Sequence, residues 1–208
     1  GPFNATGNPV ENISRSKIFI CRATDPREET ACASRILNNL AHTAFRRPVS
    51  EKDMAPLMKF YEDGRKAGSF ENAIENSLVA MLSSSKFLYR VETPPATTKP
   101  GSIYKLNDLE LASRLSFFLW SSIPDAELRT AAEQGKLKDP KVLEQQVRRM
   151  LADPKAKSLV DNFAGQWLFL RNVATVGPNP DVFPEFDANL RDAFKQQSEM
   201  FFASIITA

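Results

Sequence analysis

The segment Tyr104–Trp120, with the sequence YKLNDLELASRLSFFLW, constrains the fold of this chain more than any other. At about 100° per residue, its apolar side chains cover more than half of the circumference of a helix. A helix on a protein surface carries a narrower apolar stripe, so we expect other helices to surround this one. Asn107 is a favourable N-cap, with Glu110 three positions later as in a capping box. We therefore predict a central, buried helix in an all-α domain, with Glu110, Ser113 and Arg114 as its polar strip.

Helix-start signals recur along the rest of the chain. An Asp or Ser that can cap a helix precedes each remaining amphipathic segment, and three of these starts are Asp-Pro pairs with proline at the first helical position. We predict about eight helices in a bundle-like or orthogonal arrangement around the central helix. One of them runs through the segment 153–170, with Trp167 in the core, and Trp120 is expected in the core as well. The predicted starts outside the central helix are Asp25, Ser50, Ser69, Asp125, Asp139, Asp153 and Asp187.

A proline-rich segment, ETPPATTKPG, divides the chain at residues 92–101. Three prolines and a glycine in ten residues exclude a helix and make a semi-rigid connector. The apolar end of the chain has no cap or polar tail, so we expect the last domain to be truncated there. The predicted parts are an extended N-terminal arm at 1–24, which is the tail of a preceding domain, a three-helix subdomain at 25–91, a linker at 92–103 and a helical domain at 104–208.

The charge balance excludes several classes of protein. The 27 basic and 25 acidic residues give a net charge of +2 and are spread along the chain. Nucleic-acid binding needs clustered basic residues, so we expect no nucleic-acid partner, and we expect the pairs in FRRP (45–48) and VRRM (147–150) to be solvated. No apolar run reaches the ~18 residues of a membrane span. With one histidine, two cysteines and no C-x-x-C-H signature, we expect no metal and no cofactor in this chain.

The two cysteines, Cys21 and Cys32, lie eleven residues apart with the turn-forming pair Asp25-Pro26 between them. This spacing permits a disulfide across a short loop, which would stabilise the chain by roughly 2–3 kcal/mol. It also permits two reduced thiols in the core. We favour the disulfide, which would place the protein in an oxidising compartment.

Two groups of polar residues are candidates for chemistry, and each has a simpler explanation. Glu110 and Arg114 have the i, i+4 spacing of a tuned acidic catalyst with its partner, or of a structural ion pair, which is far commoner. Asp161, Gln166 and Trp167 offer a carboxylate, an amide and an aromatic face that could grip a sugar. However, Asp161 and Gln166 lie about 140° apart around a helix and do not share a face.

Three further features carry weaker signals. His42, near the end of the first long helix, could be a ligand or a base, but a cation beside a helix C-terminus is its default role. Asp125 and Glu127 begin a helix, where they stabilise its dipole. Asn4 and Asn12 start glycosylation triplets, which are common by chance.

Four segments carry a family resemblance: ASRILNNLAHTAFRRPVS, ELASRLSFFLWSSIPDAEL, VRRMLADPKAKSLVDNFAGQWLFL and FPEFDANLRDAF. Together they resemble two adjoining domain families of unknown function, found in very large exported proteins of planctomycete-type and related bacteria. The first family would cover residues 29–91 and the second 104–208. The resemblance implies a periplasmic or cell-surface protein linked to cytochrome-c-type domains, with any haem c elsewhere in the parent protein. It brings no assigned catalytic residues.

These observations together favour a non-catalytic helical scaffold or interaction module of a larger exported, cytochrome-c-linked protein. Its expected partners are neighbouring domains of the same protein. Chemistry normally needs several polar groups at one cleft, whereas the polar residues here finish helices and cover the surface. The alternative is a partial enzyme acting on a polysaccharide or another polymer, with Glu110 and Asp161 as its acid pair and an active site completed by missing regions.

Overall fold

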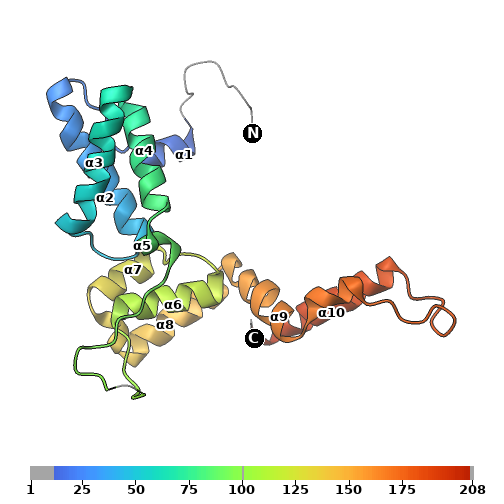
Figure 1. Ribbon diagram of the computed structural model, residues 1–208. Helices are drawn as coiled ribbons and strands as arrows, with labels where there is room; N and C mark the ends of the chain where they lie inside the picture. Colours follow the sequence, from blue (N-terminus) through green and yellow to red (C-terminus); the bar gives the residue numbers. More distant parts are fainter. Residues whose placement is uncertain (1–11, 100, 207–208) are drawn as a thin grey trace. The chain divides into compact units, whose positions relative to one another are not determined.

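The computed structural model describes residues 12–99 and 101–206 (Figure 1). In these residues every regular element is a helix, so the predicted all-α class is confirmed. The chain forms two compact units, Gly1–Val91 and Glu92–Ala208. The described residues contain ten α-helices rather than about eight, because the very short helices α1, α5 and α9 have too few turns to give an apolar period.

The first unit is built on three long helices that pack on one another, α2 (Glu29–Ala44), α3 (Glu51–Ala67) and α4 (Phe70–Leu82). Two short helices, α1 (Ile13–Ile18) and α5 (Ser85–Leu88), precede and follow them (Figure 1). The predicted reciprocal cap at Ser50 and Asp53 is present, and Ser69 caps α4 in the same way with Asn72. The core residues with the least exposure are Cys32, Ala33, Ile36, Leu37, Ala41, Leu57, Tyr61, Ala73, Ile74 and Met81.

The predicted extended arm is wrong in its described part, because residues 13–18 form helix α1. The Asn12 side chain accepts a 2.8 Å hydrogen bond from the Arg15 amide and so caps this helix. The Arg15 guanidinium pairs with Glu71 of α4 and lies 4.6 Å from the centre of the Phe19 ring. Local capping and this ion pair therefore outweigh the strand preference of the apolar residues that follow. Residues 1–11, with Asn4, lie outside the described residues.

The predicted disulfide between Cys21 and Cys32 is confirmed, with a sulfur–sulfur distance of 2.00 Å. Cys32 is 1% exposed in the first turn of α2, whereas Cys21 lies in the segment after α1 and is partly exposed. The bond therefore fixes the N-terminal segment to the core of the first unit.

Arg46, predicted to be solvated, is instead 7% exposed and ends helix α2 with a positive φ of 59°. Its guanidinium donates hydrogen bonds of 2.9–3.0 Å to the carbonyl oxygens of Ala44, Lys86 and Tyr89. These acceptors lie at the ends of α2 and around α5, so one side chain satisfies backbone groups from both helices. Burial lowers the pKa of Arg46.

The adjacent Arg47 binds Asp53, which is 3% exposed at the start of α3. Both Arg47 terminal nitrogens donate to the Asp53 carboxylate, at 2.8 and 3.0 Å, and Lys86 donates at 2.5 Å. The Ser50 amide and hydroxyl donate to the same carboxylate. The Arg47 hydrogen bonds, with those from Lys86 and Ser50, hold the pKa of Asp53 far below its ordinary value, although burial alone would raise it.

The second unit is organised around helix α6 (Asp108–Trp120), with α7 (Ala126–Glu133) and α8 (Pro140–Ala152) packed against it. The predicted capping box of Asn107 and Glu110 is present. The predicted polar strip is partly wrong, since Ser113 is buried and Phe118 is 52% exposed. Trp120 is buried as expected, and its indole N–H donates a 2.8 Å hydrogen bond to the Met150 carbonyl.

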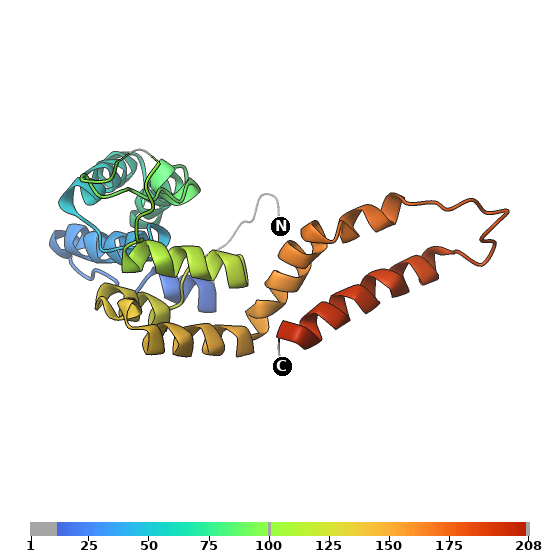
Figure 2. The same cartoon turned by 90° about the horizontal axis from the view of Figure 1, so that it is seen from below.

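The single helix predicted for residues 153–170 is wrong, because four short pieces replace it. A 3-10 turn (Pro154–Ala156), a π-helical segment (Leu159–Ala164), α9 (Gly165–Trp167) and a 3-10 segment (Leu170–Thr175) follow one another. Helix α10 (Ala188–Ile206) then returns alongside the π-helical segment and the second 3-10 segment (Figure 2). The loop residues Val182 and Phe183, predicted to pack inward, are 62% and 52% exposed. No helix in the described residues is long and apolar enough to cross a membrane.

Replacing Asp53 with Asn should lower the free energy of unfolding by about 2–3 kcal/mol, because it leaves two half-exposed cations without their buried counter-charge. Since the folded pKa of Asp53 is depressed, its contribution is present above the unfolded pKa of about 3.9 and is lost as the pH falls below it. Urea unfolding between pH 7 and pH 2 should therefore show a weaker acid dependence in Asp53→Asn. Asp63→Asn, which removes an exposed i, i+3 pair with Lys66, is the control and should change neither quantity appreciably. A wild-type acid profile in Asp53→Asn would refute the assigned role.

Replacing both Cys21 and Cys32 with Ala should destabilise the first unit by roughly 2–3 kcal/mol, because the unfolded chain loses a short covalent loop. Reducing agent should lower the unfolding midpoint of the wild type to a similar extent and leave the double variant unchanged. Two free thiols titrated in unreduced, denatured protein would contradict the disulfide.

Candidate functional site

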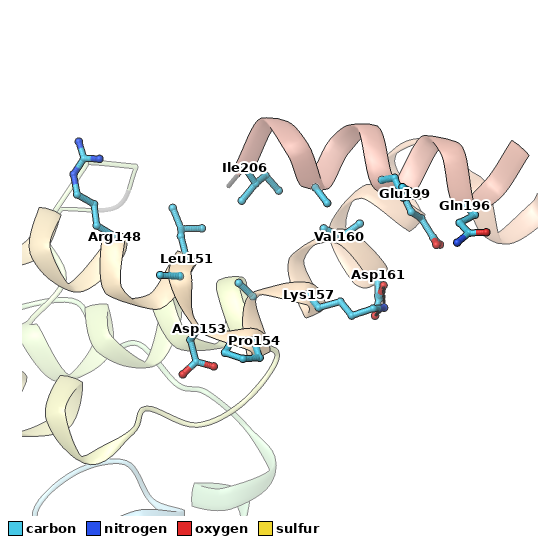
Figure 3. Close-up of a pocket in the computed structure, with 14 residues that line it drawn as sticks. Arg148, Leu151, Asp153, Pro154, Lys157, Val160, Asp161, Gln196, Glu199 and Ile206 are labelled. Atoms are coloured by element: carbon cyan, nitrogen blue, oxygen red, sulfur yellow. Dashed lines mark hydrogen bonds and ion pairs between the residues drawn. The ribbon is translucent and has the colours of Figure 1, made fainter. Parts of the chain in front are cut away.

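The second unit contains a cavity of about 730 Å³ between the end of α8, the π-helical segment and α10 (Figure 3). Its apolar lining includes Leu151, Val160, Met200, Ala203 and Ile206. In Figure 3, Leu151 and Ile206 face each other across the space from α8 and α10. The volume lies in the range of sites that hold small organic ligands, so this cavity is a candidate ligand pocket.

Four of the five charged side chains that line this cavity have an ion-pair partner, and the fifth, Asp153, accepts a 2.8 Å hydrogen bond from the Lys155 amide. Lys157 lies 2.6 Å from both carboxylate oxygens of Asp161, four residues later on the same segment. The Asp161 hydrogen bond raises the pKa of Lys157, which keeps the amine protonated and unsuited to act as a base or nucleophile. Arg148 pairs with Glu144 at 2.9 Å, and Glu199 lies 3.8 Å from Lys195. The cavity is therefore a mainly apolar space, and the charged side chains at its rim are engaged with neighbouring groups.

A row of aromatic rings lies on the same unit, contributed by α6, the π-helical segment and α9. The rings of Phe118 and Phe163 meet edge to face with centroids 5.7 Å apart, and Trp167 stacks on Phe163 at 5.8 Å. Phe202 of α10 approaches Phe163 at 6.3 Å. Phe118, Phe163 and Trp167 are 52%, 43% and 63% exposed, so the prediction that Trp167 lies in the core is wrong. We call these three residues the aromatic row.

The predicted ion pair between Glu110 and Arg114 is not formed. Arg114 binds Glu92 instead, at 2.6 and 2.9 Å, and Glu110 accepts hydrogen bonds from the amides of Thr93 and Asn107. The two side chains therefore fix the first residues of the proline-rich segment to α6 while Glu110 also completes the capping box. The i, i+4 spacing predicted Glu110 as the partner of Arg114, whereas Glu92, in the segment that precedes α6, binds Arg114 instead.

The other sequence candidates do not assemble into one site. Asp161 lines the large cavity and a smaller neighbouring one, and Glu110 lines neither. Gln166 is exposed beside Trp167, and His42 is half-buried near the end of α2 in the first unit, where it has an interaction of its own. The described residues contain no group of three or more His, Cys, Asp or Glu side chains that could hold a metal ion.

A polar network that sequence reasoning missed lies between α7 and α8. Arg149, predicted to be solvated, binds Asp125 with two hydrogen bonds of 2.6 and 3.1 Å and also pairs with Glu127 at 3.2 Å. Gln146, only 5% exposed, donates to Glu127 and accepts from Arg149. Burial is the largest single influence on the pKa of Asp125 and raises it, but the hydrogen bonds from Arg149 and from the Leu128 amide, together with the charges of Arg149 and Lys155, lower it overall. The i, i+3 spacing of Gln146 and Arg149 on α8 is the sequence pattern that could have indicated this network.

This network supports the packing of Trp120 rather than forming an open site. The Arg149 guanidinium lies 5.7 Å, and the Lys155 amine 4.6 Å, from the centre of the Trp120 ring. Such cation–π contacts stabilise by about 0.5–2 kcal/mol, depending on their desolvation. Asp108 has a comparable structural role, because its buried carboxylate accepts a 2.8 Å hydrogen bond from the Leu137 amide.

Two families of unknown function match the chain. Residues 106–208 match PSD4, described as a protein of unknown function (DUF1592), and residues 32–92 match PSD5, described as a protein of unknown function (DUF1595). The predicted resemblance to two adjoining domain families of unknown function is thus confirmed. No curated protein and no solved structure matches the chain significantly.

The two tryptophans should respond differently to a quencher, because Trp120 is 2% and Trp167 63% exposed. Acrylamide should quench one fluorescence component strongly and the other weakly. Trp167→Phe should remove the accessible component with little loss of stability, whereas Trp120→Ala should cost about 3–5 kcal/mol. A strongly protected Trp167 in the wild type would contradict the exposed aromatic row.

Proposed function

We propose that this chain is a non-catalytic helical interaction module of a larger exported, cytochrome-c-linked protein. The observation that carries the proposal is the aromatic row, in which the Phe163 ring contacts those of Phe118 and Trp167 while all three remain half-exposed. Rows of exposed aromatic rings are typical of the centre of protein interfaces, where they contribute much of the binding energy. The expected partner is the surface of a neighbouring domain of the same protein.

The absence of a catalytic role is supported by the pairing of the candidate groups. Lys157 and Asp161 neutralise each other at the cavity, and Glu110 is used in a helix cap and a backbone hydrogen bond. The alternative, a partial enzyme with Glu110 and Asp161 as its acid pair, loses support because Glu110 lines neither of the two cavities that Asp161 lines.

Export and the cytochrome-c link are supported by different observations of different strength. The Cys21–Cys32 disulfide favours an oxidising compartment, and thus export to the periplasm or cell surface. The cytochrome-c link rests on the sequence resemblance alone. The visible spectrum of the intact parent protein tests it, since bound haem c would give its characteristic absorption bands and a colourless parent would refute the link.

The interface is tested by mixing this chain with the neighbouring domains of the parent protein, produced separately. Binding should shift Trp167 emission to shorter wavelength, because the indole leaves water. Trp167→Ser and Phe118→Ser should each weaken binding by about 30-fold, as expected for a central aromatic contact of about 2 kcal/mol.

The matched control is Phe60→Ser in α3 of the first unit, because Phe60 is 50% exposed and Phe118 is 52% exposed. This variant should bind as the wild type does. The proposal would be refuted if Trp167→Ser, Phe118→Ser and Phe60→Ser lost binding equally, or if the wild type did not bind at millimolar concentration.

A further inference from the structure

Two cavities of the second unit adjoin each other and differ in character. The cavity of about 730 Å³ described above shares Lys157, Asp161 and Glu199 with a smaller cavity of about 320 Å³. In Figure 3, Asp161 and Glu199 lie at one end of the larger cavity and Arg148 at the other. The smaller cavity therefore lies at the end away from Arg148. We call the larger one the apolar cavity and the smaller one the basic pocket, whose remaining lining residues are Gly165, Leu170, Arg171 and Lys195.

The basic pocket has an excess of one positive charge. Its lining includes three cations, Lys157, Arg171 and Lys195, and two carboxylates, Asp161 and Glu199. Lys157 and Asp161 neutralise each other, because the amine lies 2.6 Å from both carboxylate oxygens. Two cations, Arg171 and Lys195, therefore remain against the single carboxylate of Glu199.

Arg171 and Lys195 both have donors to spare. The Lys195 amine lies 3.8 Å from Glu199, which is beyond hydrogen-bond distance. Arg171 donates a 3.2 Å hydrogen bond to the side-chain oxygen of Asn162, its one hydrogen bond to the described part of the chain, whereas a guanidinium has five N–H donors. Asn162 is held in turn by a 2.7 Å hydrogen bond to the Ser121 hydroxyl. The guanidinium is thus positioned from one side and able to donate from the other.

We propose that the two cavities together bind an aliphatic monocarboxylate, with its hydrocarbon chain in the apolar cavity and its carboxylate held by Arg171 and Lys195. A carboxylate matches the planar fork of a guanidinium, which can donate two parallel hydrogen bonds to it. Its single negative charge equals the excess charge of the basic pocket. A phosphate monoester would bring about −1.5 to −2 and leave the pocket with an excess of negative charge.

The π-helical segment connects the two parts of the site. Val160 lines the apolar cavity, Asp161 lines both cavities, and Gly165, directly after the segment, lines the basic pocket. Six consecutive residues thus present an aliphatic side chain to one cavity and polar or small groups to the other. Such interruptions of the α-helical period are frequent at functional sites.

The chain-length dependence of binding tests the hydrocarbon half of the proposal. Isothermal titration calorimetry of the whole chain would use n-alkanoates from butanoate to tetradecanoate, each below its micelle concentration. The dissociation constant should fall about fourfold for each added methylene group, as expected when that group leaves water, and should level off once the apolar cavity is full. The n-alcohol of the same length as a binding alkanoate should bind about tenfold more weakly, because it lacks the charge.

Single charge changes test the position of the carboxylate. Arg171→Gln should weaken alkanoate binding about tenfold and leave alcohol binding unchanged. Glu199→Gln should strengthen alkanoate binding about threefold, because it removes the nearest repulsive charge and releases Lys195. Lys141→Gln, an exposed cation at the start of α8 that lines neither cavity, is the matched control and should bind as the wild type does.

Filling the apolar cavity tests the position of the chain. Ala203→Phe should weaken alkanoate and alcohol alike, whereas Phe201→Ser, an exposed position of the same helix that lines neither cavity, should weaken neither. Circular dichroism should show unchanged helix content in both variants. If Ala203→Phe does not fold, the charge variants decide the outcome, because they alter side chains at the mouth of the site.

Four results would each overturn the proposal. These are no alkanoate binding at millimolar concentration, affinity that rises with chain length without levelling off, equal affinity for alkanoate and alcohol, and a larger loss in Arg148→Gln than in Arg171→Gln. The last would place the carboxylate at the opposite end of the apolar cavity. No residue of the aromatic row lines either cavity, so the outcome is independent of the interface test.

Discussion

The cavity and the aromatic row of the second unit depend on how the chain continues after α8, where helix α10 lies against a segment that is not a regular helix. The π-helical segment and the turns around it supply the inner contacts of α10, including the approach of Phe163 to Phe202. A continuous α-helix would carry its side chains around in a regular 3.6-residue period. The π-helical turn resets that period and leaves Val160 beside the cavity while Phe163 and Trp167 lie in the exposed row. The cavity and the row thus share a single backbone irregularity as their origin.

The first unit is constrained differently, by buried charge that is satisfied on all sides. The Asp53 carboxylate accepts hydrogen bonds from Arg47, Lys86 and Ser50. The Arg46 guanidinium donates hydrogen bonds to carbonyl groups of two helices. Such groups contribute to stability only when every hydrogen bond is made, because a half-satisfied buried charge is strongly destabilising. The FRRP segment therefore specifies how α2, α3 and α5 meet, and it is a structural element of the unit rather than a basic surface for a ligand.

Much of this architecture was predictable where the signal is local. The capping boxes at Ser50 and Asn107, the Asp-Pro starts and the short cysteine loop are set by residues within a dozen positions of one another, and they were anticipated. The failures concern partners distant in sequence. Arg114 pairs with Glu92, 22 residues away, and not with Glu110. The buried Arg46 and the partly buried Arg149 likewise bind groups 24–43 residues away. The spacing of residues along a helix did not predict these partners, because the charges on one helix do not show which segment packs against it.

The same limit explains why the candidate surfaces were misplaced. Trp167 was expected in the core because large aromatic residues are usually buried, and a regular helix from Asp153 would have turned it inward. The broken helix turns it outward instead, beside Phe163.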